Sequence, residues 1–161
     1  MKMYSRHKKI ALALFVIVFA ISLICNKFFG INIRESLMQN FITFLSIVLG
    51  FYTASISALY GSKYLGKIYD TIDTNNNKNL LIHTLQSYFR VSIYFGLITL
   101  CVLFAASIFS MVENNILLLN SFVKAIIISM ICLNVLFMYF ITRILITSLL
   151  VEGKEISSNQ N

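Results

Sequence analysis

The sequence predicts an all-α integral membrane protein with four transmembrane helices, and three observations lead to this fold class. Of the 161 residues, 58% are hydrophobic and 12% are charged, whereas charged residues make up about a quarter of a typical soluble domain. The apolar residues form long runs, and about 20 such residues are needed for a helix to cross a bilayer core ~30 Å thick. The chain contains no Pro, so we expect continuous helices without kinks.

The first apolar run follows a basic N-terminal segment. Four basic residues lie before position 10, and the run Ile10–Cys25 that follows is apolar except for Ser22. A basic start followed by an apolar run also occurs in signal peptides, but no small-residue cleavage site follows this one. We therefore expect an uncleaved transmembrane helix at about residues 10–29.

The second apolar run, which predicts a span at about residues 41–59, carries two parallel rows of small residues. One row comprises Ser46, Gly50, Ala54 and Ala58, and the other comprises Thr53, Ser57 and Gly61. Residues four apart share a helix face, and close packing along small residues is a main source of helix association in lipid. We expect this face to pack on protein, either within the chain or between copies of it.

Residues 60–90 are predicted to form a cytoplasmic helical hairpin between the second and third spans. Helical spacing continues beyond position 60, the Asn-rich segment 74–79 predicts a turn, and a helix resumes at Leu80 and enters a third span at about 91–112. The hairpin is longer than the usual connection of about 2–8 residues between bundle helices. Its candidate residues for docking a cytoplasmic partner are Lys63, Tyr64, Lys67, Tyr69 and Arg90. The alternative is a connecting loop that contacts only lipid head groups.

After a break at residues 113–115, the sequence predicts a fourth span at about 122–147 and a polar tail at 152–161 with no folding signal. Polar residues follow one face of this span, and they are Asn120, Lys124, Asn134 and Thr142, with Arg143 beside them. They either line a water-filled path or a subunit junction, or they serve simpler roles. In the simpler interpretation, which we favour, Lys124 reaches the outer interface and Asn134 bonds a neighbouring helix.

The basic residues indicate the orientation of the spans. One side carries Lys2, Arg6, Lys8, Lys9, Lys63, Lys67, Lys78, Arg90, Arg143 and Lys154, and the other carries Lys27 and Arg34, with Lys124 at its edge. The positive-inside rule then places both termini and the hairpin in the cytoplasm. An inner aromatic belt is expected from Tyr4, Tyr60, Tyr64, Tyr88 and Tyr139.

The remaining reactive side chains do not form a recognisable catalytic or metal-binding pattern. Cys25, Cys101 and Cys132 lie in apolar runs without a CxxC motif, so we expect buried, unreactive thiols. His83 is expected to be a surface residue, because no HxxxH, HExxH or paired carboxylate motif accompanies it. We expect no enzymatic activity and no cofactor, and the net charge of +7 indicates anionic lipid rather than nucleic acid as a partner.

The stretch SISALYGSKYLGKI, Ser55–Ile68, resembles the end of the second span of RexB-like phage-exclusion membrane proteins. There, too, a small-residue-rich helix runs into Gly-Ser and basic residues, which here are Leu59-Tyr60-Gly61-Ser62-Lys63, followed by Leu65 and Lys67-Ile68. The layout of the chain, with cytoplasmic termini and a basic middle loop, is similar to that of the membrane subunits (KwaA) of the Kiwa defence system. The resemblance implies a bacterial inner-membrane protein of antiphage defence that forms a homo-oligomer, a tetramer if the subunits are Kiwa-like.

Three functions are compatible with this resemblance. The first is a sensor of infection or membrane perturbation that docks a cytoplasmic effector, and the length of the hairpin favours it. The second is an oligomeric ion channel that depolarises the membrane, as in a RexB-like protein. The third is a holin-like pore, which the hairpin disfavours because holins need little cytoplasmic structure.

Overall fold

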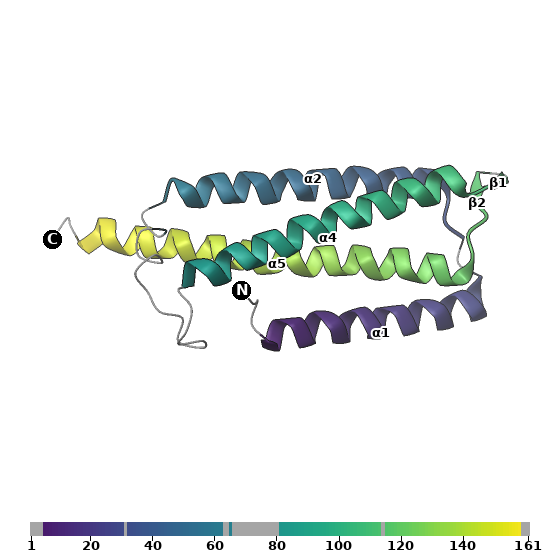
Figure 1. The fold of residues 1–161 in the computed structure, drawn as a ribbon, viewed down its shortest axis with the longest axis horizontal. Coiled ribbons are helices and arrows are strands. Elements are labelled where there is room, and N and C mark those ends of the chain that lie inside the picture. The colour runs from purple at the N-terminus through teal and green to yellow at the C-terminus, as the bar shows by residue number, and fades with distance from the viewer. Residues whose placement is uncertain (1–4, 31, 63–64, 66–80, 114, 159–161) are drawn as a thin grey trace.

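The structure, a computed structural model, describes residues 5–30, 32–62, 65, 81–113 and 115–158 (Figure 1). Four long helices make up most of this part of the chain, and they are α1 (Ser5–Phe29), α2 (Glu35–Tyr60), α4 (Leu81–Phe109) and α5 (Ser121–Ser158). Each contains a stretch long and apolar enough to cross a membrane: His7–Phe29, Glu35–Tyr60, Ile82–Phe109 and Ser121–Thr147. The predicted all-α fold with four transmembrane helices is confirmed.

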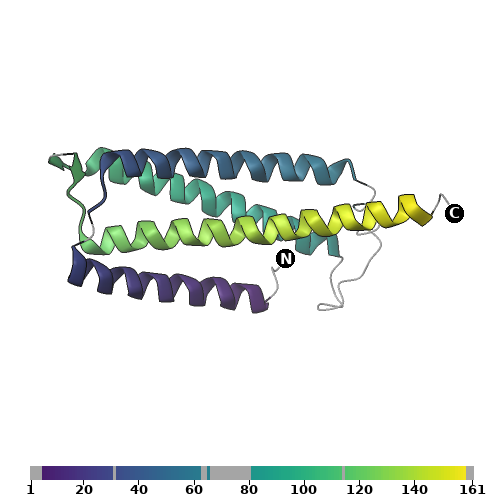
Figure 2. The same ribbon diagram turned by 180° about the vertical axis from the view of Figure 1, so that it is seen from behind.

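Helix α5 is the central helix of the bundle. It packs against α1, α2 and α4, and 44% of its apolar stretch is buried, compared with 11% for α1. Figures 1 and 2 show α5 between α1 and the pair formed by α2 and α4. Helix α1 therefore lies at the periphery of the bundle, with α5 as its main neighbour.

One end of the bundle, here called the strand end, is closed by a short β-hairpin. Strands β1 (Val112–Glu113) and β2 (Ile116–Leu117) pair in antiparallel fashion, and Asn115 makes the turn with a φ of 61°, a conformation that Asn tolerates. The Leu117 N–H donates to the Ile33 carbonyl at 3.0 Å, so the link between α1 and α2 joins the hairpin. Ile33 and Leu117 are both 1% exposed and extend the apolar core. The predicted break at residues 113–115 is confirmed.

The opposite end, here called the termini end, carries the first residue of α1, the last of α2, the first of α4 and the last of α5 (Figure 1). Helix α4 continues from Leu81 through Arg90 into the third span, as predicted. Helix α2 ends at Tyr60, so the helix does not run on without a break as predicted, but Leu65 is again helical. The Ser62 N–H and hydroxyl both donate to the Leu59 carbonyl, at 3.1 and 2.8 Å. In a continuing α-helix, the Ser62 N–H would instead donate to the carbonyl four residues earlier.

The remainder of the predicted hairpin, including the docking candidates Lys63, Tyr64, Lys67 and Tyr69, lies outside the described residues. At the C-terminal side, α5 continues to Ser158, through most of the polar tail in which the sequence showed no folding signal. A helix that has already formed extends at little cost, and Glu and Lys are good helix formers even with one Gly among them.

Candidate functional site

Three helices are tied together by hydrogen bonds at the centre of the bundle. The Asn134 side chain on α5 donates from Nδ2 to Thr99 Oγ1 on α4 at 2.9 Å and to the Met130 carbonyl at 2.9 Å. The Tyr52 hydroxyl on α2 donates to the backbone carbonyl of Asn134 at 3.1 Å. Tyr52, Thr99 and Asn134 are all fully buried. Polar side chains inside a membrane bundle commonly join helices in this way.

At the same level of the bundle, side chains of two neighbouring helices pack tightly against Gly96. A Cβ atom added to this glycine would lie 2.9 Å from Leu49 Cδ2 on α2 and 3.3 Å from Asn134 Oδ1 on α5. Asn134 Oδ1 is buried and accepts no conventional hydrogen bond within the described residues.

The residues of the predicted polar face of α5 differ in how deeply they are buried. Asn120 and Arg143 are exposed, Lys124 and Thr142 are half-buried, and Asn134 is fully buried. Ile127 lies on the same face, between Lys124 and Asn134, and is also fully buried. The bond from Asn134 to Thr99 is the neighbouring-helix bond that the simpler interpretation expected. These contacts fill the interior of the bundle around Asn134. Within one chain, the polar face of α5 therefore does not line an open path next to this residue.

The small residues of α2 face away from the other helices. All the residues of both rows are exposed: Ser46, Gly50, Thr53, Ala54, Ser57, Ala58 and Gly61. The opposite face of α2 supplies buried residues instead, namely Met38, Leu45, Val48, Tyr52, Ser55 and Leu59. The sequence left open whether the small face packs within the chain or between copies of it. Because the face is exposed, it does not pack within the chain.

The hydroxyl groups of this small face are already satisfied. Ser46 donates to the Ile42 carbonyl at 2.9 Å, Thr53 to the Gly50 carbonyl at 2.8 Å, and Ser57 to the Thr53 carbonyl at 3.2 Å. No heavy atom lies within 4 Å of the position that a Gly50 Cβ would occupy. The face is consequently shallow and open to lipid or to a neighbouring helix.

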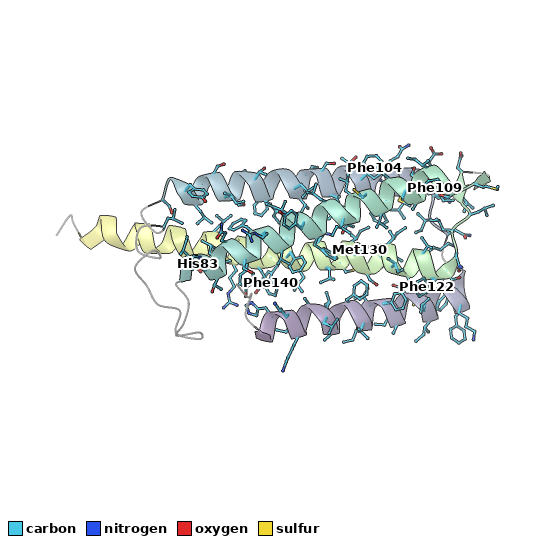
Figure 3. All side chains as sticks on the ribbon, viewed as in Figure 1. His83, Phe104, Phe109, Phe122, Met130 and Phe140 are labelled. Atoms are coloured by element: carbon cyan, nitrogen blue, oxygen red, sulfur yellow. The ribbon has the colours of Figure 1, made fainter. Side chains whose placement is uncertain are left out.

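An aromatic cluster that the sequence did not reveal joins three helices at the termini end. The His7 Nδ1 on α1 and the Tyr88 hydroxyl on α4 share a hydrogen bond. The His7 ring stacks on Phe140 of α5 with ring centroids 4.7 Å apart, and Figure 3 shows Phe140 near the start of α1. Tyr88 is only 4% exposed, so its predicted place in an aromatic belt is wrong. Tyr60 and Tyr139 are exposed.

A cleft of about 310 Å³ opens between α2 and α4 near the termini end. Its walls are apolar and include Ile56, Leu85, Phe89 and Ile93, and its polar lining residues are Tyr60, Gln86, Arg90 and Tyr94. Arg90 was a predicted docking residue and is exposed. Tyr60 was predicted only as part of an aromatic belt, and the remaining residues were not singled out, because the sequence does not reveal which part of α2 lies opposite which part of α4.

The reactive side chains are spread over the described part of the chain. His83 is exposed, as expected, but the prediction of three buried thiols is wrong, because Cys101 is exposed and Cys25 and Cys132 are only half-buried. Cys101 lies on an outward face of α4, where lipid rather than protein would cover it. No three His, Cys, Asp or Glu side chains among the described residues come together as metal ligands would.

The site therefore consists of three features: the polar contacts inside the bundle, the small-residue face of α2 and the cleft at the termini end. Comparison of the chain with protein-family models, with curated proteins and with solved structures finds no match.

Proposed function

We propose that this chain is a bacterial inner-membrane scaffold that assembles with copies of itself through α2 and docks a cytoplasmic effector at the termini end. The observation that carries the proposal is the outward orientation of every small residue in the two rows of α2. The wider role, antiphage defence with sensing of infection or membrane perturbation, is supported by the resemblance of Ser55–Ile68 to RexB-like proteins and of the layout to Kiwa membrane subunits.

The small face of α2 fits a helix partner better than it fits lipid. Lipid tails solvate apolar helix faces as well as another helix does, so association depends on how closely two backbones can approach. Gly50 and Ala54 lie side by side on a face with no bulky neighbour at Gly50, which permits a close approach. Identical faces on identical subunits favour closed cyclic symmetry, and a tetramer is the Kiwa-like form.

The termini end is the side that we assign to the cytoplasm. It carries the exposed residues Lys8, Lys9, Arg90 and Arg143, whereas the exposed basic residues at the strand end are Lys27 and Arg34. The positive-inside rule relates such an excess to the cytoplasmic face. A cytoplasmic effector would then meet the ends of α2 and α4, next to the docking candidate Arg90.

An ion channel between subunits is the second candidate function. The bundle of one chain is filled at the level of Tyr52, Thr99 and Asn134, so a conducting path would have to lie where subunits meet. The exposed hydroxyl-bearing residues Ser46, Thr53 and Ser57 favour this candidate, because they could line such a junction.

The assembly is tested by enlarging the small face. In the double substitution Gly50→Leu and Ala54→Leu, we expect the purified protein to become monomeric in mild detergent, as measured by light scattering, and protection against phage to be lost. The control is Ala13→Leu with Ala20→Leu, which enlarges two exposed positions of α1 and should leave assembly intact. A double variant of α2 that keeps the oligomeric mass of the unmodified protein would refute assembly through this face.

Docking is tested separately by changing Lys63 and Lys67 to Glu and Tyr64 to Ala in one variant. We expect this protein to insert and assemble normally but to lose co-purification of its effector. Retention of the effector at its original level would contradict docking at these residues and leave assembly through α2 unaffected.

A further inference from the structure

We propose that the cleft between α2 and α4 binds an anionic phospholipid of the cytoplasmic leaflet, with an acyl chain between the helices and the phosphate on Arg90. This inference rests on the proposed orientation of the termini end toward the cytoplasm, but it does not require the chain to be an oligomer.

The shape of the cleft follows from the arrangement of the two helices. Figures 1 and 2 show α2 and α4 close together near the strand end and farther apart toward the termini end. Between the separated ends lie the apolar side chains Ile56, Leu85, Phe89 and Ile93. The volume of about 310 Å³ is at the lower end of the range of about 300–1,000 Å³ for ligand pockets. That is enough for part of one acyl chain.

The mouth of the cleft carries groups that suit a phosphate at the membrane surface. Tyr60 is 67% exposed and Tyr94 is 61% exposed, and Tyr is enriched at the head-group level of membrane proteins. Gln86 and Arg90 are exposed one turn apart on α4. Side chains of a helix lean toward its N-terminus, so the Arg90 guanidinium leans toward Gln86 and away from the bilayer centre.

Arg90 is available for an anionic ligand. Within the described residues it takes part in neither a hydrogen bond nor an ion pair. A guanidinium group binds phosphate oxygens through two parallel N–H donors. The apolar walls beside this cation select a ligand that has both a negative head group and a hydrocarbon chain, and an anionic phospholipid combines the two.

The chain contains no Trp, so one introduced Trp can report the lipid at the cleft. The experiment uses the full chain with Tyr94→Trp in vesicles that contain phosphatidylglycerol or phosphatidylcholine with brominated acyl chains, which quench Trp fluorescence on contact. We expect brominated phosphatidylglycerol to be enriched about fivefold over brominated phosphatidylcholine next to this Trp. The reason is that one basic side chain attracts an anionic lipid by about 1 kcal/mol. Adding Arg90→Gln should abolish the preference, and adding Arg90→Lys should retain part of it.

A matched pair on α5 separates the cleft from general attraction to a basic surface. Tyr139, 58% exposed, and Arg143 are one turn apart on α5, as Tyr94 and Arg90 are on α4, but neither lines the cleft. With Tyr139→Trp as the reporter, we expect a smaller preference for phosphatidylglycerol, unaffected by Arg90→Gln. Circular dichroism of each variant checks that the helices are retained.

Three results would overturn the proposal. The first is equal quenching by the two brominated lipids at Tyr94→Trp. The second is a preference that persists in Arg90→Gln. The third is an absence of quenching at Tyr94→Trp while Tyr139→Trp is quenched, which would mean that protein rather than lipid fills the cleft.

Discussion

At the scale of single residues, Gly96 of α4 leaves room for the side chains of Leu49 on α2 and Asn134 on α5. The side-chain bonds of Asn134 to Thr99 and Met130 fix its orientation, and a Cβ atom at Gly96 would lie 3.3 Å from Asn134 Oδ1. Hydrogen bonds between membrane helices contribute only about 0.6 kcal/mol on average. Loss of one such bond should therefore change the stability of the bundle only slightly.

Replacing Gly96 by Ala should stabilise the bundle less than Gly50→Ala does, because the new methyl group would lie 2.9 Å from Leu49 Cδ2 and 3.3 Å from Asn134 Oδ1 and these side chains would have to shift, which offsets the gain of about 1 kcal/mol in helix propensity. Gly50→Ala is the matched control, since its methyl group meets no atom within 4 Å and Ala is the better helix former by about 1 kcal/mol. Unfolding by SDS titration in mixed micelles measures both free energies, and equal effects of the two glycine substitutions would contradict the tight packing at Gly96.

At the scale of elements, the positions of the four helices could be predicted because lipid leaves a chain few choices. Backbone polar groups in hydrocarbon must bond within their own segment, so a long apolar run without Pro predicts a helix. The ends were less predictable, because outside the bilayer water can satisfy the backbone. There the Ser62 bonds end α2 early, and α5 continues to Ser158.

The contacts between helices could not be predicted from one sequence. Spacing along α4 places Tyr88 on a helix face, but nothing in the sequence pairs it with His7, 81 positions away, or with Phe140. The same holds for the cleft, in which Arg90 was identified by its charge whereas Tyr94 and Gln86 acquire significance only opposite the end of α2. The polar face of α5 was visible from its spacing, but the partner of Asn134 was not.

Helix α1 should depend on His7 for its attachment at the termini end. His7→Leu removes the hydrogen bond to Tyr88 and the stacking on Phe140, and a lost hydrogen bond costs about 1 kcal/mol. We expect amide hydrogen exchange in the first turns of α1 to accelerate about fivefold in nanodiscs. Tyr88→Phe should give a smaller change, and Tyr139→Phe, at an exposed position, should give none. Unchanged exchange in His7→Leu would mean that packing on α5 alone holds α1.

At the scale of the whole molecule, one chain is a filled bundle with an unoccupied helix face. The buried side chains at Tyr52, Thr99 and Asn134 leave the chain's own interior unsuited to conduction. Asn134→Leu should accordingly leave any ion flux through proteoliposomes unchanged, as measured with a potential-sensitive dye. A flux that falls severalfold in this variant would indicate instead that Asn134 lines a path.

The central claim, that α2 meets α2 of another copy, is tested most directly by disulfide cross-linking in native membranes. The three natural cysteines are replaced by Ser, and a single Cys is placed at Ala54 or, as the control, at the exposed Ala105 of α4. A disulfide requires Cβ atoms about 3.5–4.5 Å apart, a separation that helices packed on small residues can reach. We predict rapid formation of covalent dimers from Ala54→Cys and none from Ala105→Cys, and equal or absent cross-linking at the two positions would contradict the claim.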